Sequence, residues 1–192
     1  VEGWPSVFAK NLPDGGISMV IAYVDDLLFL GTKGLRDEIA TLRKRIKMDD
    51  PAPLGKYLGC NHRTSLVEVG GEQVTTAEFD MVDYFGQACR TYVSESGLAL
   101  QPAESPYAPD LPAGQLDKLL ADGGRFAGKA ASFLMKLLYG ARMAGPWLTV
   151  AIMRLARQIH KWNAECDRRL HRLYCYIAGT MEQVLTGTLS TG

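Results

Sequence analysis

The segment ISMVIAYVDDLLFLGTKG, from Ile17 to Gly34, decides how this chain folds. Apolar and small residues lead into the adjacent carboxylates of Asp25 and Asp26, and four apolar residues follow them. Short apolar runs bounded by turn residues are typical of strands, so we predict strands at Ile17–Val24 and Leu27–Leu30, joined at the aspartates. The question is why such a hairpin carries two charges.

Two explanations fit the paired carboxylates. Unpaired charges in an apolar setting are costly, and two of them repel each other. Lys10 is the only Lys or Arg between Val1 and Gly31, so a divalent cation is a better local partner than a base. Mg²⁺ suits one or two carboxylates together with substrate phosphates. The alternative is a plain hairpin turn in water, although Asp-Asp lacks the glycine that tight hairpins favour.

The composition limits the remaining possibilities. With 192 residues, 47% of them hydrophobic, the chain is long enough for one medium domain with a sizeable core. It has no apolar run of about 18 residues, which predicts no membrane span. It shows no secretory leader. Because the first residue is Val1 rather than Met, we expect it to be part of a longer product.

Four cysteines without a CxxC pair predict free thiols in a reducing compartment. Cys166, His171 and Cys175 suggest zinc, but their spacing is not that of a standard finger. Packed or half-exposed helix residues are therefore the favoured interpretation of these three side chains.

The net charge is zero, yet the charges are unevenly distributed. Ser65 to Gly124 holds ten acids and two bases, whereas Arg154 to Arg172 holds six bases and two acids. Lys33 to Arg63 holds eight bases and four acids. This pattern predicts two positive surfaces and an acidic insert, and ordinary solvated helix faces explain it equally well.

Strand patterns come first along the chain and helical patterns later, which predicts an α+β fold. A first strand is expected at Ser6–Lys10, and a second hairpin is expected to turn at Gly70-Gly71. The other expected elements are helices at Leu35–Met48, Phe79–Glu95, Leu148–Ile159 and Leu170–Ile177, a helical region that begins at Phe133 and is broken at Gly145-Pro146, and a Pro-rich loop or strap at Leu100–Gly114.

Five segments resemble, in order, those of copia-type retrotransposon polymerases. They are PSVFAK (5–10), AYVDDLLFLG (22–31), LGKYLG (54–59), KLLYGARMAGPWLTVAIMRLAR (136–157) and LHRLYCYIAGT (170–180). The YVDD tetrapeptide alone is a weak motif. The ordered set covers nearly the whole chain and is much more specific.

The resemblance implies a partial right-hand polymerase, with antiparallel palm hairpins followed by a helical thumb and connection. Residues 1–75 would be the later half of the palm, with the YVDD hairpin and a hairpin like the primer grip. Residues 76–124 would be a helix and a Pro-rich connecting segment. Residues 125–192 would be the helical thumb and connection, leading towards an RNase H domain. The fingers and the third catalytic aspartate are expected outside this chain.

The implied activity is that of an RNA-directed DNA polymerase, a reverse transcriptase that transfers nucleotides with two metal ions. Asp25 and Asp26 match its metal-binding catalytic pair, and Tyr23 and Val24 match positions near the primer end. Leu58-Gly59 matches the hairpin that grips the primer. The expected contacts to the nucleic-acid backbone are Lys44, Lys47, Lys56, Arg154, Arg157, Lys161, Arg168 and Arg172. From their spacing of three and four residues, Arg154, Arg157 and Lys161 are expected to share one helix face, and Arg168 and Arg172 a face of the next helix.

The resemblance also implies partners and a location. The cofactor would be Mg²⁺ or Mn²⁺, and the substrates an RNA or DNA template with a primer and deoxynucleotide triphosphates. The rest of a polyprotein, with fingers, RNase H and integrase, would accompany the chain. No membrane partner is expected, and the location would be intracellular, in a cytoplasmic particle or the nucleus.

Two motifs depart from the family. Ala144 to Trp147 stand where the family usually has Thr-Arg-Pro-Asp, and Cys166-Asp167 where it usually has a His-Trp pair. Without the third aspartate, the chain alone is expected to be inactive. The alternatives are a degenerate remnant that binds nucleic acid without catalysis, and a structural fragment whose carboxylates are merely solvated.

Overall fold

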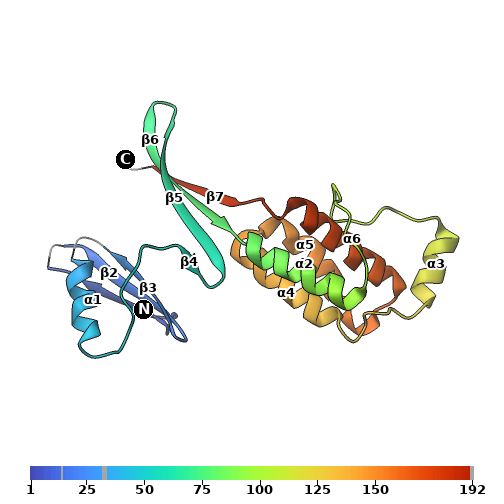
Figure 1. The fold of residues 1–192 in the computed structure, drawn as a ribbon, viewed down its shortest axis with the longest axis horizontal. Helices are drawn as coiled ribbons and strands as arrows, with labels where there is room; N and C mark the ends of the chain where they lie inside the picture. The colour runs from blue at the N-terminus through green and yellow to red at the C-terminus, as the bar shows by residue number, and fades with distance from the viewer. Residues whose placement is uncertain (14, 32–33, 191–192) are drawn as a thin grey trace. The chain divides into compact units, whose positions relative to one another are not determined.

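The computed structural model describes residues 1–13, 15–31 and 34–190 (Figure 1). Within these residues the fold is mixed α+β, as the sequence predicted, and it has six α-helices and two antiparallel sheets. The chain divides into two compact units, Val1–Pro53 and Leu54–Gly192. The domain boundary expected after residue 75 falls inside strand β6 (Glu72–Asp80) of the second unit.

The first unit is a three-stranded sheet with one helix. Its strands are β1 (Val7–Asn11), β2 (Ile17–Tyr23) and β3 (Asp26–Gly31), in the order β1-β2-β3, and its helix is α1 (Leu35–Arg43). The strands therefore lie within a few residues of their predicted positions.

Helix α1 covers one face of this sheet. The Lys10 ammonium on β1 pairs with the Glu38 carboxylate on α1 at 2.8 Å, although both groups meet solvent. Gly31 lies under the helix, where an added Cβ would approach the Ile17 carbonyl oxygen to 2.8 Å and the Leu35 side chain to 3.3 Å. A glycine is favoured there chiefly because the backbone of strand β2 leaves no room for a Cβ, and the Leu35 side chain of α1 narrows the space further.

The opposite face of the sheet is apolar and has no helix over it in the described part of this unit. The strand register places Ile17, Leu30 and Tyr23 on this face. Their exposed fractions are 53%, 43% and 54%. The apolar run is therefore only partly buried within this unit, where α1 covers one of the two faces of the sheet.

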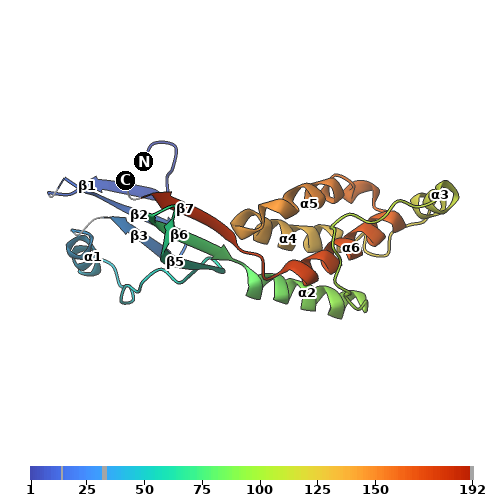
Figure 2. The same cartoon turned by 90° about the horizontal axis from the view of Figure 1, so that it is seen from above.

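The sheet of the second unit has the order β4-β5-β6-β7. Strand β4 spans Lys56–Tyr57, β5 spans Cys60–Val69, and β7 spans Leu185–Ser190. Strands β5 and β6 form a long ribbon that extends from the helices (Figures 1 and 2). The ribbon turns at Gly70-Gly71, as predicted, and both glycines have the positive φ that a type I′ turn requires.

The helices of the second unit pack around an aromatic centre. They are α2 (Val82–Ser96), α3 (Ala113–Ala121), α4 (Ala130–Ala144), α5 (Thr149–Ala156) and α6 (Ala164–Thr180). Tyr92 of α2 stacks on Tyr174 of α6, with ring centroids 4.1 Å apart, and Phe133 of α4 meets both rings edge-on. Helix α3 contributes no buried residue.

Three helix predictions were wrong at their ends. Helix α1 stops at Arg43 rather than Met48, because Arg45 and Ile46 turn back to the Leu42 carbonyl. Helix α2 starts at Val82, because Phe79 and Asp80 still belong to β6. Helix α5 stops at Ala156 and is followed by a separate 3₁₀ turn at Ile159–Lys161.

Candidate functional site

The two aspartates lie at a tight hairpin turn between β2 and β3. Tyr23 pairs with Asp26 as the last rung of the ladder, so Val24 and Asp25 form a two-residue loop. Val24 is 93% exposed. The predicted junction of two strands at the aspartates is therefore confirmed.

Val24 has an unusual backbone conformation, with φ at +56°. A positive φ at the first loop position is the feature of a type II′ turn, where glycine is preferred. For a β-branched residue it is a strained conformation that costs about 1–3 kcal/mol, and such strain clusters at functional sites. A valine thus takes the place of the glycine that the sequence lacks.

Both carboxylates are exposed. This corrects the expectation that they sit in an apolar setting, because water alone can solvate them and no counter-ion is needed for the fold. Their oxygens still match the hard ligands that Mg²⁺ prefers. Across residues 1–13, 15–31 and 34–190, no group of three His, Cys, Asp or Glu side chains is arranged to hold a metal. Two adjacent carboxylates are a partial donor set for an ion with about six ligands.

The exposed pair predicts the effect of removing one charge. Asp25→Asn should leave the melting temperature unchanged or raise it in the absence of metal, because the repulsion from Asp26 is relieved. Thermal unfolding of both proteins in a chelator tests this, with the exposed Asp37→Asn as a control on α1. A clearly lower melting temperature for Asp25→Asn alone would mean that this carboxylate holds the turn together.

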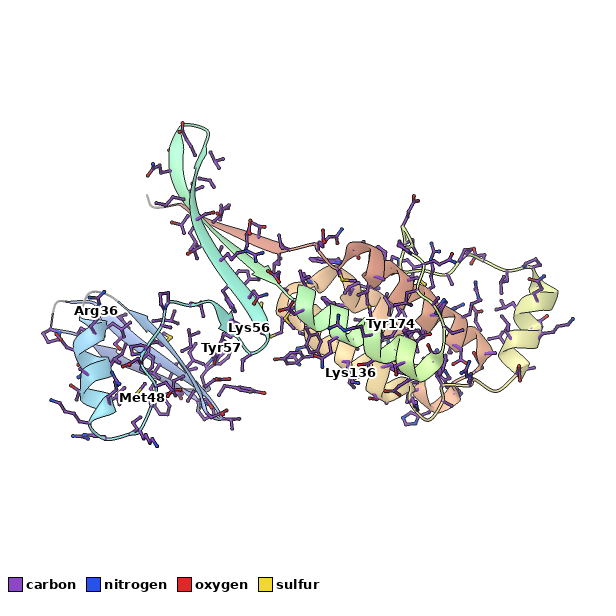
Figure 3. The ribbon with its side chains drawn as sticks, in the orientation of Figure 1. Arg36, Met48, Lys56, Tyr57, Lys136 and Tyr174 are labelled. Carbon is purple, nitrogen blue, oxygen red and sulfur yellow. The ribbon has the colours of Figure 1, made fainter. Side chains whose placement is uncertain are left out.

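The hairpin between β4 and β5 is the second predicted site. Leu58 and Gly59 form its two-residue loop with φ of +50° and +78°, the pattern of a type I′ turn. The Tyr139 hydroxyl of α4 donates to the Leu58 carbonyl at 2.7 Å. Lys56 on β4 (Figure 3) pairs with Asp83 at the start of α2, at 3.3 Å. The loop is therefore anchored on two helices, and Lys56 is partly engaged.

Both predicted phosphate contacts of the first unit lie after the end of helix α1. Lys44 caps the C-terminal end of α1 and Lys47 follows it, and both are exposed. They are accessible to an anion. They do not lie on the continuous helix face that the prediction of Leu35–Met48 implied.

The bases at 154–161 do not share one helix face, which corrects the expectation from their spacing. Arg154 lies on α5, Arg157 follows its end, and Lys161 ends the 3₁₀ turn. The Arg154 guanidinium stacks over the Tyr107 ring, 5.3 Å from its centroid. Arg157 and Lys161 are exposed.

The bases of α6 donate hydrogen bonds within the protein. Arg168 donates to both oxygens of the buried Glu165 at 2.6 and 2.8 Å, and to the Pro109 carbonyl at 2.9 Å. Arg172 donates its Nε to the Ser105 carbonyl at 2.9 Å. Arg168 therefore uses both Nε and Nη2 within the protein, and Arg172 uses its Nε, so fewer donors than predicted are left for a phosphate.

Three of the predicted bases contact one Pro-rich segment, a link that the sequence did not indicate. The strap, Leu100–Leu111, crosses α5 and α6 and receives Arg154, Arg168 and Arg172 on its Tyr107 ring and its carbonyls. The four prolines of Leu100–Gly114 predicted an extended segment, and three of them lie in the strap. No sequence signal indicated which helices it would contact, because backbone carbonyls are present in every loop.

The suspected zinc residues come together only in part. The Cys175 sulfur lies 3.5 Å from His171 Nε2, whereas Cys166 borders a different cavity.

No family model, no curated protein and no solved structure matches this chain. In the part of the chain that the structure describes, no helix has both the length and the apolar character that crossing a membrane requires.

Proposed function

We propose that this chain is the later palm and the thumb of a reverse transcriptase, an RNA-directed DNA polymerase of a copia-type retrotransposon. The observation that supports this most directly is the YVDD turn, in which a strained Val24 exposes Asp25 and Asp26 together at the tip of an antiparallel hairpin. A solvated turn would have no need of a valine at positive φ. The ordered motifs along the chain add to this argument.

In the proposed reaction, the residues of the turn bind and orient. Asp25 and Asp26 supply carboxylate ligands, and the strained Val24 fixes the direction in which they point. Divalent ions, when bound, activate the attacking 3′ oxygen and neutralise the leaving pyrophosphate. Tyr23, exposed beside Asp26 in the last rung of the ladder, offers a ring against the primer end.

The proposed phosphate contacts are fewer than the sequence suggested. Arg157, Lys161, Lys44 and Lys47 are exposed and remain candidates. Arg168 and Arg172 are engaged with the strap and with Glu165, so we assign them to the stability of the helices. We further propose an intracellular location, as the family resemblance implies.

Nucleic-acid binding tests this assignment. Changing Arg157 and Lys161 together to Ala should weaken binding of a primer–template duplex to a similar extent for unrelated sequences, because phosphate contacts carry no sequence information. The salt dependence of log K should flatten by about 0.9 for each lost contact. Fluorescence anisotropy at several salt concentrations measures both quantities.

The matched control is Lys118→Ala on α3, an exposed base on a helix without buried residues. If the double variant binds with the same affinity and slope as the unchanged chain, these bases are a solvated face. If the unchanged chain binds no duplex at all, the structural-fragment alternative gains. Binding without metal-dependent catalysis in a completed polymerase would favour the degenerate remnant.

A further inference from the structure

A second constellation of reactive side chains lies on α6 and α2. The Cys175 sulfur lies 3.5 Å from His171 Nε2, one helical turn away. His171 Nδ1 lies 3.3 Å from the Tyr92 hydroxyl. Cys175 is thus a nucleophile beside a base, His171, and Tyr92 orients that base. This is the arrangement that activates a thiol.

The protonation states suit this role. Burial lowers the pKa of His171, so its imidazole is neutral near neutral pH and able to accept a proton. Burial raises the pKa of Tyr92, which therefore keeps its proton. With its own proton on Nδ1, His171 donates to the Tyr92 oxygen and presents the Nε2 lone pair to the thiol.

The thiol borders a cavity. The cavity has a volume of about 390 Å³, and Gln101, Pro102, Arg168, His171, Arg172 and Cys175 are among its lining residues. The charge of Arg168 is largely balanced by Glu165. Arg172 donates its Nε to the Ser105 carbonyl. Within the described residues, this leaves its terminal amino groups available to an anion in the cavity. The lining therefore favours a small, negatively charged molecule.

We propose that Cys175 is a modification site that exchanges with a small anionic disulfide bound in this cavity. The thiol proton passes to His171 Nε2, and the thiolate attacks one sulfur of the disulfide. A new bond forms from Cys175 Sγ to that sulfur as the S–S bond of the reagent breaks. The leaving thiolate then takes the proton from His171, so the exchange needs no other oxidant.

Other titratable and charged groups around the pair come from three segments. Helix α2 contributes Cys89 and Tyr92, helix α6 contributes Asp167, Arg168, Arg172 and Tyr174, and the strap contributes Asp110 near Arg168; Arg125, which precedes α4, also acts on Tyr92. Burial raises the pKa of Cys89 to about 11, so that thiol remains protonated. The pH dependence of exchange is therefore expected to follow His171.

The chain holds its own control for the role of the histidine. Cys166 is also buried and also borders a cavity, of about 420 Å³, lined by Arg154, Arg157 and Arg169. That lining includes no histidine. A comparison of Cys175 with Cys166 in one molecule separates the effect of His171 from that of arginine and cavity access.

The test is exchange of the full chain with glutathione disulfide, followed by mass spectrometry of the peptides that carry each cysteine. Cys175 should react roughly a hundredfold faster than Cys166 and Cys89, the low end of general-base assistance. His171→Gln should slow Cys175 alone and remove the inflection of its rate at the lowered pKa of the histidine. Cystamine, which is positively charged, should react more slowly at Cys175 than glutathione disulfide does, and Arg172→Gln should abolish this difference between the two reagents.

Equal rates at Cys175 and Cys166 in the unchanged chain would overturn the proposal, and this comparison needs no variant to fold. An unchanged rate and pH profile at Cys175 in a folded His171→Gln protein would also overturn it.

Discussion

Replacing Asp167 by Ala is expected to destabilise the second unit by about 3–5 kcal/mol, because a charged acceptor of several hydrogen bonds is lost. Asp167 Oδ1 accepts the Trp162 indole N–H at 2.6 Å and the Phe126 amide at 3.2 Å, and Oδ2 accepts the Arg125 amide. Trp162 and Phe126 are buried, so their donors would lose their partner where water does not replace it. Denaturation in urea measures the change.

Asp117→Ala on α3 is the matched control for Asp167, because this carboxylate is exposed on a helix without buried residues. It should change the free energy of unfolding by no more than about 0.5 kcal/mol. If Asp167→Ala lowers the free energy of unfolding as little as this control does, the three donors are hydrogen-bonded by water instead. Asp167 would then not stabilise the packing of Trp162, Phe126 and Arg125 around it.

Glu165→Ala is expected to lower the free energy of unfolding by about 2–3 kcal/mol, which is less than the loss for breaking a fully buried ion pair. The Glu165 side chain is 2% exposed, whereas its partners Arg168 and Arg169 are 28% and 55% exposed and can turn to water. The loss should also loosen the strap, because Arg168 links Glu165 to the Pro109 carbonyl.

This effect depends on pH in a defined direction. The hydrogen bonds from Arg168 lower the pKa of Glu165 in the folded chain, against the opposing effect of burial. A carboxylate with a lowered folded pKa stabilises the fold above its unfolded pKa of about 4.3 and loses this contribution as pH falls through the folded value. The difference between the unchanged chain and Glu165→Ala should therefore be full near neutral pH and shrink below about pH 4. The exposed Glu182→Ala is the control; an equal difference at all these pH values would contradict the account.

The sequence predicted most of the elements but not all of their ends. The two hairpins and the stop at Gly145-Pro146 follow from local turn chemistry, which short patterns carry. Helix α5 ends at Ala156 without Gly or Pro, because the next residues must bring Trp162 into the core and Asn163 to the N-cap of α6. Such long-range demands leave no local signal.

The candidate site was predictable where it is local. The position of Asp25 and Asp26 in a turn followed from the apolar runs around them, but their exposure did not, because it depends on what covers the sheet. The spacing of Arg168 and Arg172 correctly placed them on one helix. It could not show that carbonyls of Ser105 and Pro109, some 60 residues earlier, would take up their donors.

The most direct test of the central claim is primer extension on an RNA template. The chain would be joined to the first half of a related polymerase, which supplies the third aspartate. The account predicts Mg²⁺-dependent synthesis that falls by about a hundredfold or more in Asp25→Asn and in Asp26→Asn, the scale of losing one group that stabilises the transition state. Asp37→Asn, an exposed carboxylate of the same unit, should leave synthesis unchanged. Synthesis that survives both aspartate substitutions, or robust synthesis by residues 1–192 alone, would contradict it.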